Sequence, residues 1–224
     1  MGEERKKKEN SWIVDLFFRV YNDNKRKRYA KENQKIQGHP VVFFGDSITD
    51  NCDLEKYYPG IYAFNRGISG NTTEDLLKRM KVSVYDAHPS KVVLLIGIND
   101  MMNEGYRPKA VAFRYREILW RLKKYCPDAR IICQSVYPGW DGDPSKADRG
   151  QVFPIAYLAE DIVELNGYIR KLCEKYGCTY VDVHSCLKLE DNTMDHSCSF
   201  DGCHPNDAGY RRVSAVLRSY LERE

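Results

Sequence analysis

The chain has 224 residues, of which 42% are hydrophobic and 30% are charged, the balance of an ordinary water-soluble domain with one substantial core. Its 35 basic and 32 acidic residues leave a formal net charge of +3, which is too slight to indicate a nucleic-acid partner. No apolar run is long enough to form a transmembrane helix, so we expect a single globular unit.

Residues 1–35 are predicted to form a basic amphipathic helical extension, ahead of a domain over residues 36–224. Apolar residues recur at helical spacing from Ser11 to Gln34, and the second half of this segment is strongly basic. The apolar positions are Ile13, Leu16, Phe17, Val20 and Tyr21. Asp15 interrupts the apolar stretch and no small-residue cleavage site follows, which argues against a secretory signal. Lys6 stands where an N-myristoylation motif requires Ser or Thr. We therefore expect a cytoplasmic protein whose cysteines are reduced.

Five short apolar runs, rich in β-branched residues, have the composition of buried strands. They are Pro40–Phe44, Ile61–Phe64, Lys91–Ile96, Ala129–Gln134 and Thr179–Val183. Runs such as Val92–Ile96 do not alternate between polar and apolar residues, which is typical of strands covered on both faces in a parallel sheet.

Segments with helical periodicity alternate with these strands. Apolar residues three and four positions apart predict helices over residues 111–122 and 158–176. Another helix is expected to begin near Thr72, and a last one after Pro205, with Val213, Val216, Leu217 and Tyr220 facing inward. This alternation predicts a three-layer α/β fold with helices on both faces of the sheet.

Chemically active residues follow the predicted strands at one edge of the sheet. Ser47 comes after the first strand, Gly67 after the second and Asn99 after the third. Asp201 and His204 stand just before the last helix. Because ligands bind beyond the carboxyl ends of the strands in such sheets, we expect these residues to meet at one site.

Ser47, His204 and Asp201 have the residue types of a nucleophile, a base and the carboxylate that orients the base. Asp201 precedes His204 by three residues, so its carboxylate can accept from one imidazole nitrogen while the other faces the nucleophile. Taken alone, Gly45-Asp46-Ser47 is more typical of a serine at a helix N-cap. It is also not the G-x-S-x-G turn of the α/β-hydrolases, because Thr49 stands at the last position. The combination predicts acyl transfer by a different hydrolase design.

An oxyanion needs hydrogen-bond donors, and three are expected at the same edge. Asn99 offers its side-chain amide, and Gly67 and Ser47 offer backbone N–H groups. The alternatives are an asparagine in a turn and a glycine required for a positive φ.

A metal site is the competing interpretation of His196, Cys198, Cys203 and His204. The paired ligand spacing of zinc sites is absent, so we expect no metal. Cys203, beside His204, would instead make the site sensitive to thiol reagents.

Four segments in this order resemble the SGNH hydrolases, also called GDSL-like lipases and acylhydrolases. They are Val42–Thr49, Asn65–Thr73, Ile96–Asp100 and Asp201–Pro205. The first two are most similar to the branch that contains platelet-activating-factor acetylhydrolase-like and carbohydrate esterase-like proteins.

This resemblance implies a flavodoxin-like, five-stranded parallel sheet and neither a metal nor an organic cofactor. It implies Ser47 as nucleophile, His204 as base and Asp201 as its orienting partner. Gly67, Asn99 and the Ser47 amide would form the oxyanion hole. The leucine of the GDSL motif is replaced by Ile48.

The function expected on these grounds is hydrolysis of short-chain acyl esters, above all acetyl esters, through an acyl-enzyme on Ser47. The partner would be a small-molecule ester such as an acetylated carbohydrate. Asp46 and Trp140 are candidate substrate contacts, Trp140 because the loop over residues 138–154 is expected to form a wall or lid. A lysophospholipase, a thioesterase, an acyltransferase and a non-catalytic module that binds an anionic surface stay open, as does assembly into a homo-oligomer.

Overall fold

Five short parallel strands form one sheet in the order β2-β1-β3-β4-β5. They are β1 (Val41–Gly45), β2 (Ala63–Gly67), β3 (Lys91–Leu95), β4 (Arg130–Gln134) and β5 (Thr179–Val181). The computed structural model describes residues 2–103, 105–142 and 152–222, with side chains from residue 16 onward. The predicted five-stranded parallel sheet is confirmed.

The second strand lies further along the chain than expected. The sequence predicted Ile61–Phe64, whereas β2 continues to Gly67, which pairs with Gly45. Asn65 and Arg66 are tolerated in this edge strand because both find polar partners. The Asn65 amide donates to the carbonyl groups of Thr49 and Cys52, and Arg66 reaches Glu32 and Asn33.

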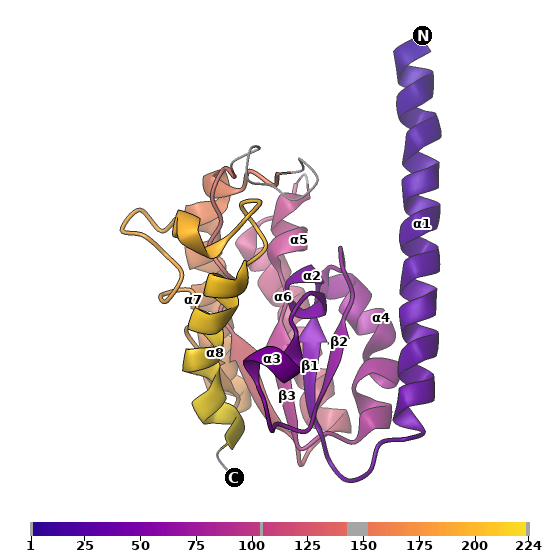
Figure 1. Ribbon diagram of the computed structural model, residues 1–224, viewed down its shortest axis with the longest axis vertical. Coiled ribbons are helices and arrows are strands. Elements are labelled where there is room, and N and C mark those ends of the chain that lie inside the picture. The colour runs from indigo at the N-terminus through magenta and orange to yellow at the C-terminus, as the bar shows by residue number, and fades with distance from the viewer. Residues whose placement is uncertain (1, 104, 143–151, 223–224) are drawn as a thin grey trace.

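Helices cover both faces of the sheet, as predicted. The longer ones are α1 (Gly2–Asn33), α4 (Thr73–Ser83), α6 (Pro108–Tyr125), α7 (Ala159–Tyr176) and α8 (Asp207–Glu222). The short ones are α2 (Ser47–Asp50), α3 (Leu54–Tyr57) and α5 (Ile98–Met102), with 3₁₀ turns at Tyr85–Ala87, Ala156–Leu158 and His196–Cys198. α4, α6 and α7 pack side by side on one face, and α3 and α8 lie against the other (Figure 1).

Local signals explain where these helices begin and end. α4 begins with a capping box in which Thr72 and Asp75 satisfy each other's backbone amides. α6 has Pro108 at its first position, where no backbone donor is needed, and α7 ends at Gly177 in the left-handed conformation.

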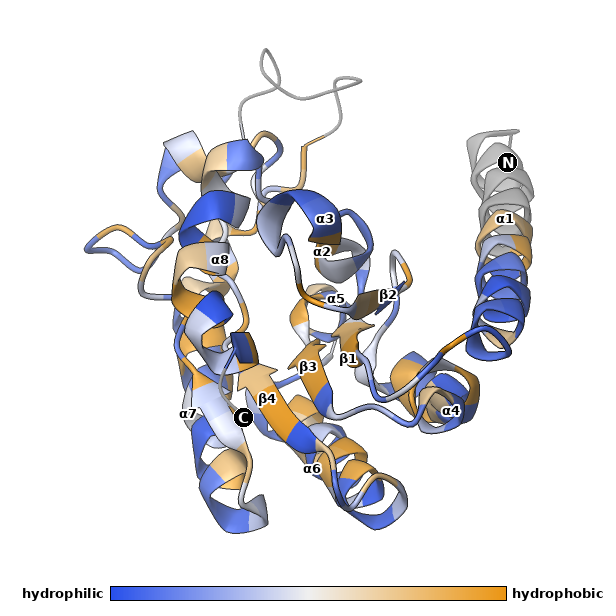
Figure 2. Cartoon of the chain, turned by 60° about the horizontal axis from the view of Figure 1, so that its bottom comes forward, coloured by the Kyte–Doolittle hydropathy of each residue, from blue (hydrophilic) through white to orange (hydrophobic). Residues whose placement is uncertain are grey.

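The core lies between the sheet and its two helical layers. Every residue of β1 is buried, as are four of the five in β3 and in β4, so the unbroken apolar runs reflect coverage on both faces. Figure 2 shows the hydrophobic colour concentrated on these strands and on parts of α4 and α6.

α1 packs on the domain with its second half, and its first half rises beyond the edge of the sheet (Figure 1). Leu16, Phe17 and Val20, part of the expected apolar face, are 48, 64 and 49% exposed, whereas Tyr29 is fully buried. The face of α1 that contacts the domain is therefore largely polar, and the apolar pattern did not identify it. The expected division after residue 35 stays a prediction. Within the described residues, no helix combines the length and apolar character needed to cross a bilayer.

Candidate active site

Ser47 begins α2 immediately after β1 ends, at a turn that requires a glycine. A Cβ on Gly45 would lie 2.3 Å from Oγ1 of Thr49 and 2.4 Å from the carbonyl oxygen of Leu95. The N-cap of α2 is Asp46, whose Oδ1 accepts from the amide of Ile48 at 3.0 Å. The capping interpretation of Ser47 is therefore wrong, and the Ser47 hydroxyl is not used as a cap.

The Ser47 hydroxyl meets His204, which a different part of the chain brings to the same edge. Oγ of Ser47 lies 2.8 Å from Nε2 of His204. Tyr210, in α8, donates to the carbonyl of Ile48 at 2.7 Å and so ties the helix after His204 to α2. The hydroxyl can thus donate to a neutral imidazole, the arrangement that general-base catalysis requires.

Asp201 holds both the backbone and the ring of His204. Its Oδ2 lies 2.6 Å from Nδ1 of His204, and its Oδ1 accepts from the amides of His204 and Cys203 at 2.7 and 2.9 Å. The turn is closed by Ser199, whose Oγ donates to the carbonyl of His204 at 2.8 Å. A spacing of three residues therefore places the carboxylate where it selects the tautomer with the proton on Nδ1.

Asp201 remains a carboxylate in this setting. Burial would raise its pKa, but the hydrogen bonds from the side chain and the amide of His204 outweigh burial and lower the pKa below its usual value. The negative charge is available to stabilise an imidazolium when the base takes up a proton.

Two phenylalanines enclose the imidazole, and sequence reasoning missed both. The rings of Phe153 and His204 meet edge to face with centroids 5.3 Å apart, and the Phe200 ring stacks on His204 at 6.4 Å. Phe153 is placed by its amide, which donates to the carbonyl of Asp201 at 2.7 Å. Phe200 directly precedes Asp201 in the sequence, and this position could have indicated that its ring lies near His204.

Asn99 reaches the same region from the start of α5. Its Nδ2 donates to the carbonyl of Asn71 at 3.0 Å, which leaves a second amide hydrogen. Its neighbour Asp100 is buried and accepts from the amide and the hydroxyl of Thr73, so α5 is tied to α4. The amide of Ser47 lies in the first turn of α2, where backbone N–H groups have no partner within the helix.

Gly67 is not available as an oxyanion donor, which corrects the expectation. Its amide donates to Oδ1 of Asn65 at 2.9 Å, and its carbonyl accepts from the hydroxyl of Tyr29 at 2.5 Å. It is buried, and a Cβ here would lie 2.3 Å from the backbone nitrogen of Asp50. Glycine is needed at this position for close packing of β2 against α2.

Gly70, three residues further along the chain in the loop after β2, is the alternative candidate for the donor. It is exposed, has a φ of +78°, and precedes the residue whose carbonyl Asn99 contacts. The sequence contains both glycines in one motif and offers no signal of which amide is already paired.

The two predicted substrate contacts are buried. Asp46 is 1% exposed, and burial raises its pKa to about 7, partly opposed by the hydrogen bond from Ile48. Trp140 is 8% exposed, with its ring stacked on His196 at 4.6 Å and its amide donating to the carbonyl of Gly202. Asp46 directly precedes Ser47, and Trp140 is hydrogen-bonded to Gly202, next to Asp201; their contact with a substrate stays a prediction. The expected lid falls partly outside the described residues, at positions 143–151.

Within residues 16–103, 105–142 and 152–222, no three His, Cys, Asp or Glu side chains are placed so that they could hold a metal ion together. His204 is engaged with Ser47 and Asp201. Cys203 is 4% exposed, and burial raises the pKa of its thiol well above the usual range, so the expected sensitivity to thiol reagents is not supported. All eight cysteines are free thiols.

Comparison with known proteins agrees with this geometry. Residues 43–212 match the sequence model of the GDSL-like Lipase/Acylhydrolase family. An acetylxylan esterase from Geobacillus stearothermophilus is 34% identical over 213 residues, which cover 81% of this chain and 93% of that protein.

Solved structures show the same fold. A structure from Streptococcus pneumonia, described as a candidate platelet activating factor, superposes with a TM-score of 0.82 at 23% identity and covers 95% of this chain and 98% of that one. A GDSL-like lipase from Bacteroides thetaiotaomicron gives a TM-score of 0.74 at 24% identity and covers 88% of this chain and 97% of its own.

Proposed function

The chain belongs to the GDSL-like lipase/acylhydrolase family, and on that basis we propose that it is a serine esterase that removes short acyl groups, chiefly acetyl, through an acyl-enzyme on Ser47. Membership of the family and the acetylxylan esterase relative identify it as a hydrolase of ester bonds. The observation that carries the mechanism is the continuous hydrogen-bonded series from Ser47 through His204 to Asp201.

The reaction follows from the protonation states of these three groups. Nε2 of His204 takes the proton of the Ser47 hydroxyl as Oγ attacks the ester carbonyl, and Asp201 stabilises the imidazolium. The tetrahedral intermediate collapses when its C–O bond to the alcohol breaks, and the imidazolium gives its proton to the departing alcohol. Water then attacks the acyl-enzyme with His204 again as base, which releases the carboxylic acid and restores the Ser47 hydroxyl.

The developing oxyanion would be held by the amides of Ser47 and Gly70 and by Nδ2 of Asn99. These donors come from α2, from the loop after β2 and from α5, which all start at the carboxyl edge of the sheet. Each such donor typically contributes about 2.7–4 kcal/mol to transition-state stabilisation. Asn71 links two of them, because its carbonyl accepts from Asn99 and its amide nitrogen is bonded to the carbonyl carbon of Gly70.

The proposed substrate is an acetylated carbohydrate, in line with the 34% identical acetylxylan esterase. Transfer of the acyl group to an alcohol instead of water would use the same three residues. A non-catalytic binding module, by contrast, has no need for an imidazole aligned between a hydroxyl and a carboxylate, so the assembled triad favours an enzyme.

The test compares wild type with Ser47→Ala on p-nitrophenyl acetate and on acetylated xylo-oligosaccharides. We expect the substitution to abolish hydrolysis, with a loss of about 10⁴-fold or more in kcat. A series of p-nitrophenyl esters of increasing acyl length should show kcat/KM falling beyond short chains. Equal turnover by wild type and Ser47→Ala would contradict the acyl-enzyme mechanism. A preference for long acyl chains would contradict the assignment to acetyl groups.

A further inference from the structure

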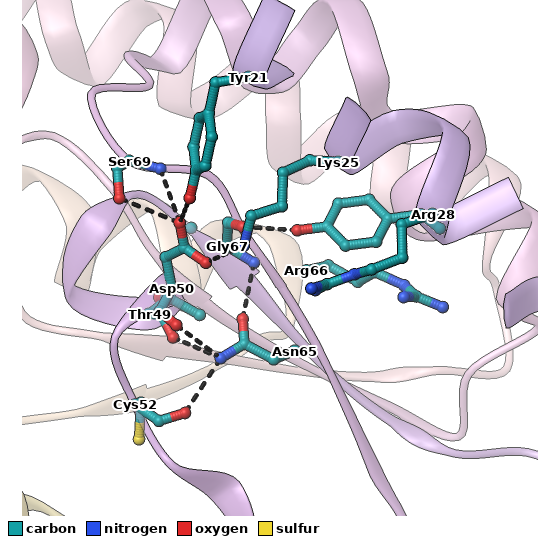
Figure 3. A network of polar contacts seen from close by, with 12 residues as sticks. Tyr21, Lys25, Arg28, Thr49, Asp50, Cys52, Asn65, Arg66, Gly67 and Ser69 are labelled. Atoms are coloured by element: carbon teal, nitrogen blue, oxygen red, sulfur yellow. Dashed lines mark hydrogen bonds and ion pairs between the residues drawn. The ribbon is translucent and has the colours of Figure 1, made fainter. Parts of the chain in front are cut away.

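α1 contacts α2, β2 and the loop between β2 and α4 through polar residues that recur once per helical turn. Asn22, Lys25, Tyr29 and Asn33 lie three or four positions apart and so share one face of the helix. Its members reach Asp50 and residues in the 65–71 segment, the part of the chain that carries the proposed Gly70 donor. Figure 3 shows Lys25 directed at Asp50.

Asp50, the last residue of α2, connects α1 to the loop between β2 and α4. It lies three residues after Ser47, its side chain is 6% exposed, and it accepts hydrogen bonds from Tyr21 and Lys25 of α1. The same carboxylate accepts from the amide and the hydroxyl of Ser69 at 3.2 and 3.0 Å (Figure 3). Because an unpaired buried carboxylate is costly, the cation from α1 is what permits Asp50 to hold Ser69 in place.

A second connection leads from α1 to the side chain of Asn99. Nδ2 of Asn71 donates to Oδ1 of Asn22 at 3.0 Å, and the carbonyl of Asn71 accepts from Nδ2 of Asn99 at 3.0 Å. Asn71 is 2% exposed, and its Oδ1 accepts from Nε of the buried Arg79 at 2.7 Å. Asn22 and Arg79 therefore hold the two ends of the side-chain amide of Asn71, the residue whose carbonyl orients Asn99.

A third connection fixes the base of the loop. The hydroxyl of Tyr29, a fully buried residue, donates to the carbonyl of Gly67 at 2.5 Å. The Gly67 amide is held at the same time by Asn65, so both polar groups of this glycine are fixed where the loop leaves β2 (Figure 3).

We propose that α1 is a positioning element of the oxyanion hole, with Asn22, Lys25 and Tyr29 as positioning residues for ester hydrolysis. This inference rests on the proposed function. The helix orders residues 65–71, which are the end of β2 and the loop after it, so that the Gly70 amide and the Asn99 side chain face the oxyanion together. Misplacement of catalytic groups by about 1 Å can cost 100-fold in rate, which makes such support kinetically visible.

The experiment uses the full chain with Asn22→Ala, Lys25→Met and Tyr29→Phe. The matched controls are Asn24→Ala and Lys27→Met at exposed positions of the same helix, and Tyr115→Phe at an equally buried tyrosine of α6. For each protein one measures Tm, kcat and KM with p-nitrophenyl acetate, and inhibition by phenylboronic acid, which forms a tetrahedral adduct on an active-site serine.

We expect each α1 variant to lose about tenfold or more in kcat and to bind the boronic acid correspondingly more weakly, with KM changed by less than about twofold. The controls should match wild type, and Lys25→Arg should recover activity because it restores the cation beside Asp50. A merely structural role would lower Tm and the fraction of active enzyme but would leave the boronic acid affinity of the folded molecules unchanged, and that result overturns the proposal.

Hydrogen exchange in the 65–71 segment separates this inference from the proposed function. If wild type hydrolyses no ester in a Ser47-dependent way, the proposed function fails. Faster exchange of these amides in the α1 variants than in the controls would still support the positioning of the loop. Exchange equal to wild type in all three folded variants contradicts it.

Discussion

Oγ of Ser47 lies 2.8 Å from Nε2 of His204, although 157 positions separate the two residues in the chain. The contact arises because β1 delivers Ser47 to the carboxyl edge of the sheet and because Tyr210 ties α8, just after His204, to the backbone of α2. Ser47 and His204 are therefore brought together by the contact between α2, which directly follows the first strand, and the last helix.

Replacement of Asp201 by asparagine should separate catalysis from folding. The Asp201→Asn side chain would keep Oδ1, which accepts from two backbone amides, but would present an NH₂ group to Nδ1 of His204 and so favour the wrong tautomer. We expect kcat on p-nitrophenyl acetate to fall by about 10³–10⁴-fold with little change in Tm. A variant that retains a tenth of wild-type activity would show that Asp201 does not orient the base.

Removal of the Asn99 side-chain amide should lower kcat and leave KM almost unchanged, because the oxyanion is absent from the bound ester and develops only as the tetrahedral intermediate forms. The expected loss for Asn99→Ala is about 10²–10³-fold. The neighbouring Asn103→Ala, at an exposed position, is the matched control. An increase in KM alone would mean that Asn99 binds the ester in its ground state.

The carboxyl group of Asp46 should make the protein less stable as pH rises. Burial raises its pKa to about 7, so between about pH 4 and 7 the folded protein holds a proton that the unfolded chain has released. Stability from this group is fully present below about pH 4 and is lost as pH rises through about 7, up to about 4 kcal/mol.

Asp46→Asn keeps an N-cap oxygen but cannot ionise. The free energy of unfolding of the variant minus that of wild type, from urea titrations, should therefore become more positive from pH 5 to pH 8. A difference independent of pH would show that Asp46 is ionised throughout.

Loss of Glu32 should leave the buried guanidinium of Arg66 without its charged partner. Burial lowers the pKa of Arg66, and Glu32 opposes that shift through an ion pair and hydrogen bond. Breaking a buried pair costs about 3–5 kcal/mol, and because Glu32 is 34% exposed we expect about 1–3 kcal/mol for Glu32→Gln. Urea unfolding checks this value, with exposed Glu55→Gln as control; equal midpoints for the two variants would refute it.

Much of the fold could be predicted from short-range patterns. Unbroken apolar runs such as Val92–Ile96 indicated buried parallel strands, and residues at helical spacing indicated α6, α7 and α8. The residues of the triad could also be proposed, since the distance between Asp201 and His204 in sequence sets their geometry within one turn. These features depend on neighbours a few residues away, which a sequence displays directly.

Local patterns could not show which glycine, Gly67 or Gly70, offers its amide to the proposed oxyanion hole. The Gly67 amide is occupied by the side chain of Asn65, and that side chain is turned toward it because its own amide donates to the carbonyl groups of Thr49 and Cys52, 16 and 13 residues earlier. The polar face of α1 could not be predicted either, because its partners, Asp50 and Asn71, are far from it in sequence. Composition and spacing predicted the sheet, the residues of the proposed triad and the class of chemistry. Which backbone donors are free, and which face of the first helix packs, depended on hydrogen bonds between distant segments, which exist only once the chain has folded.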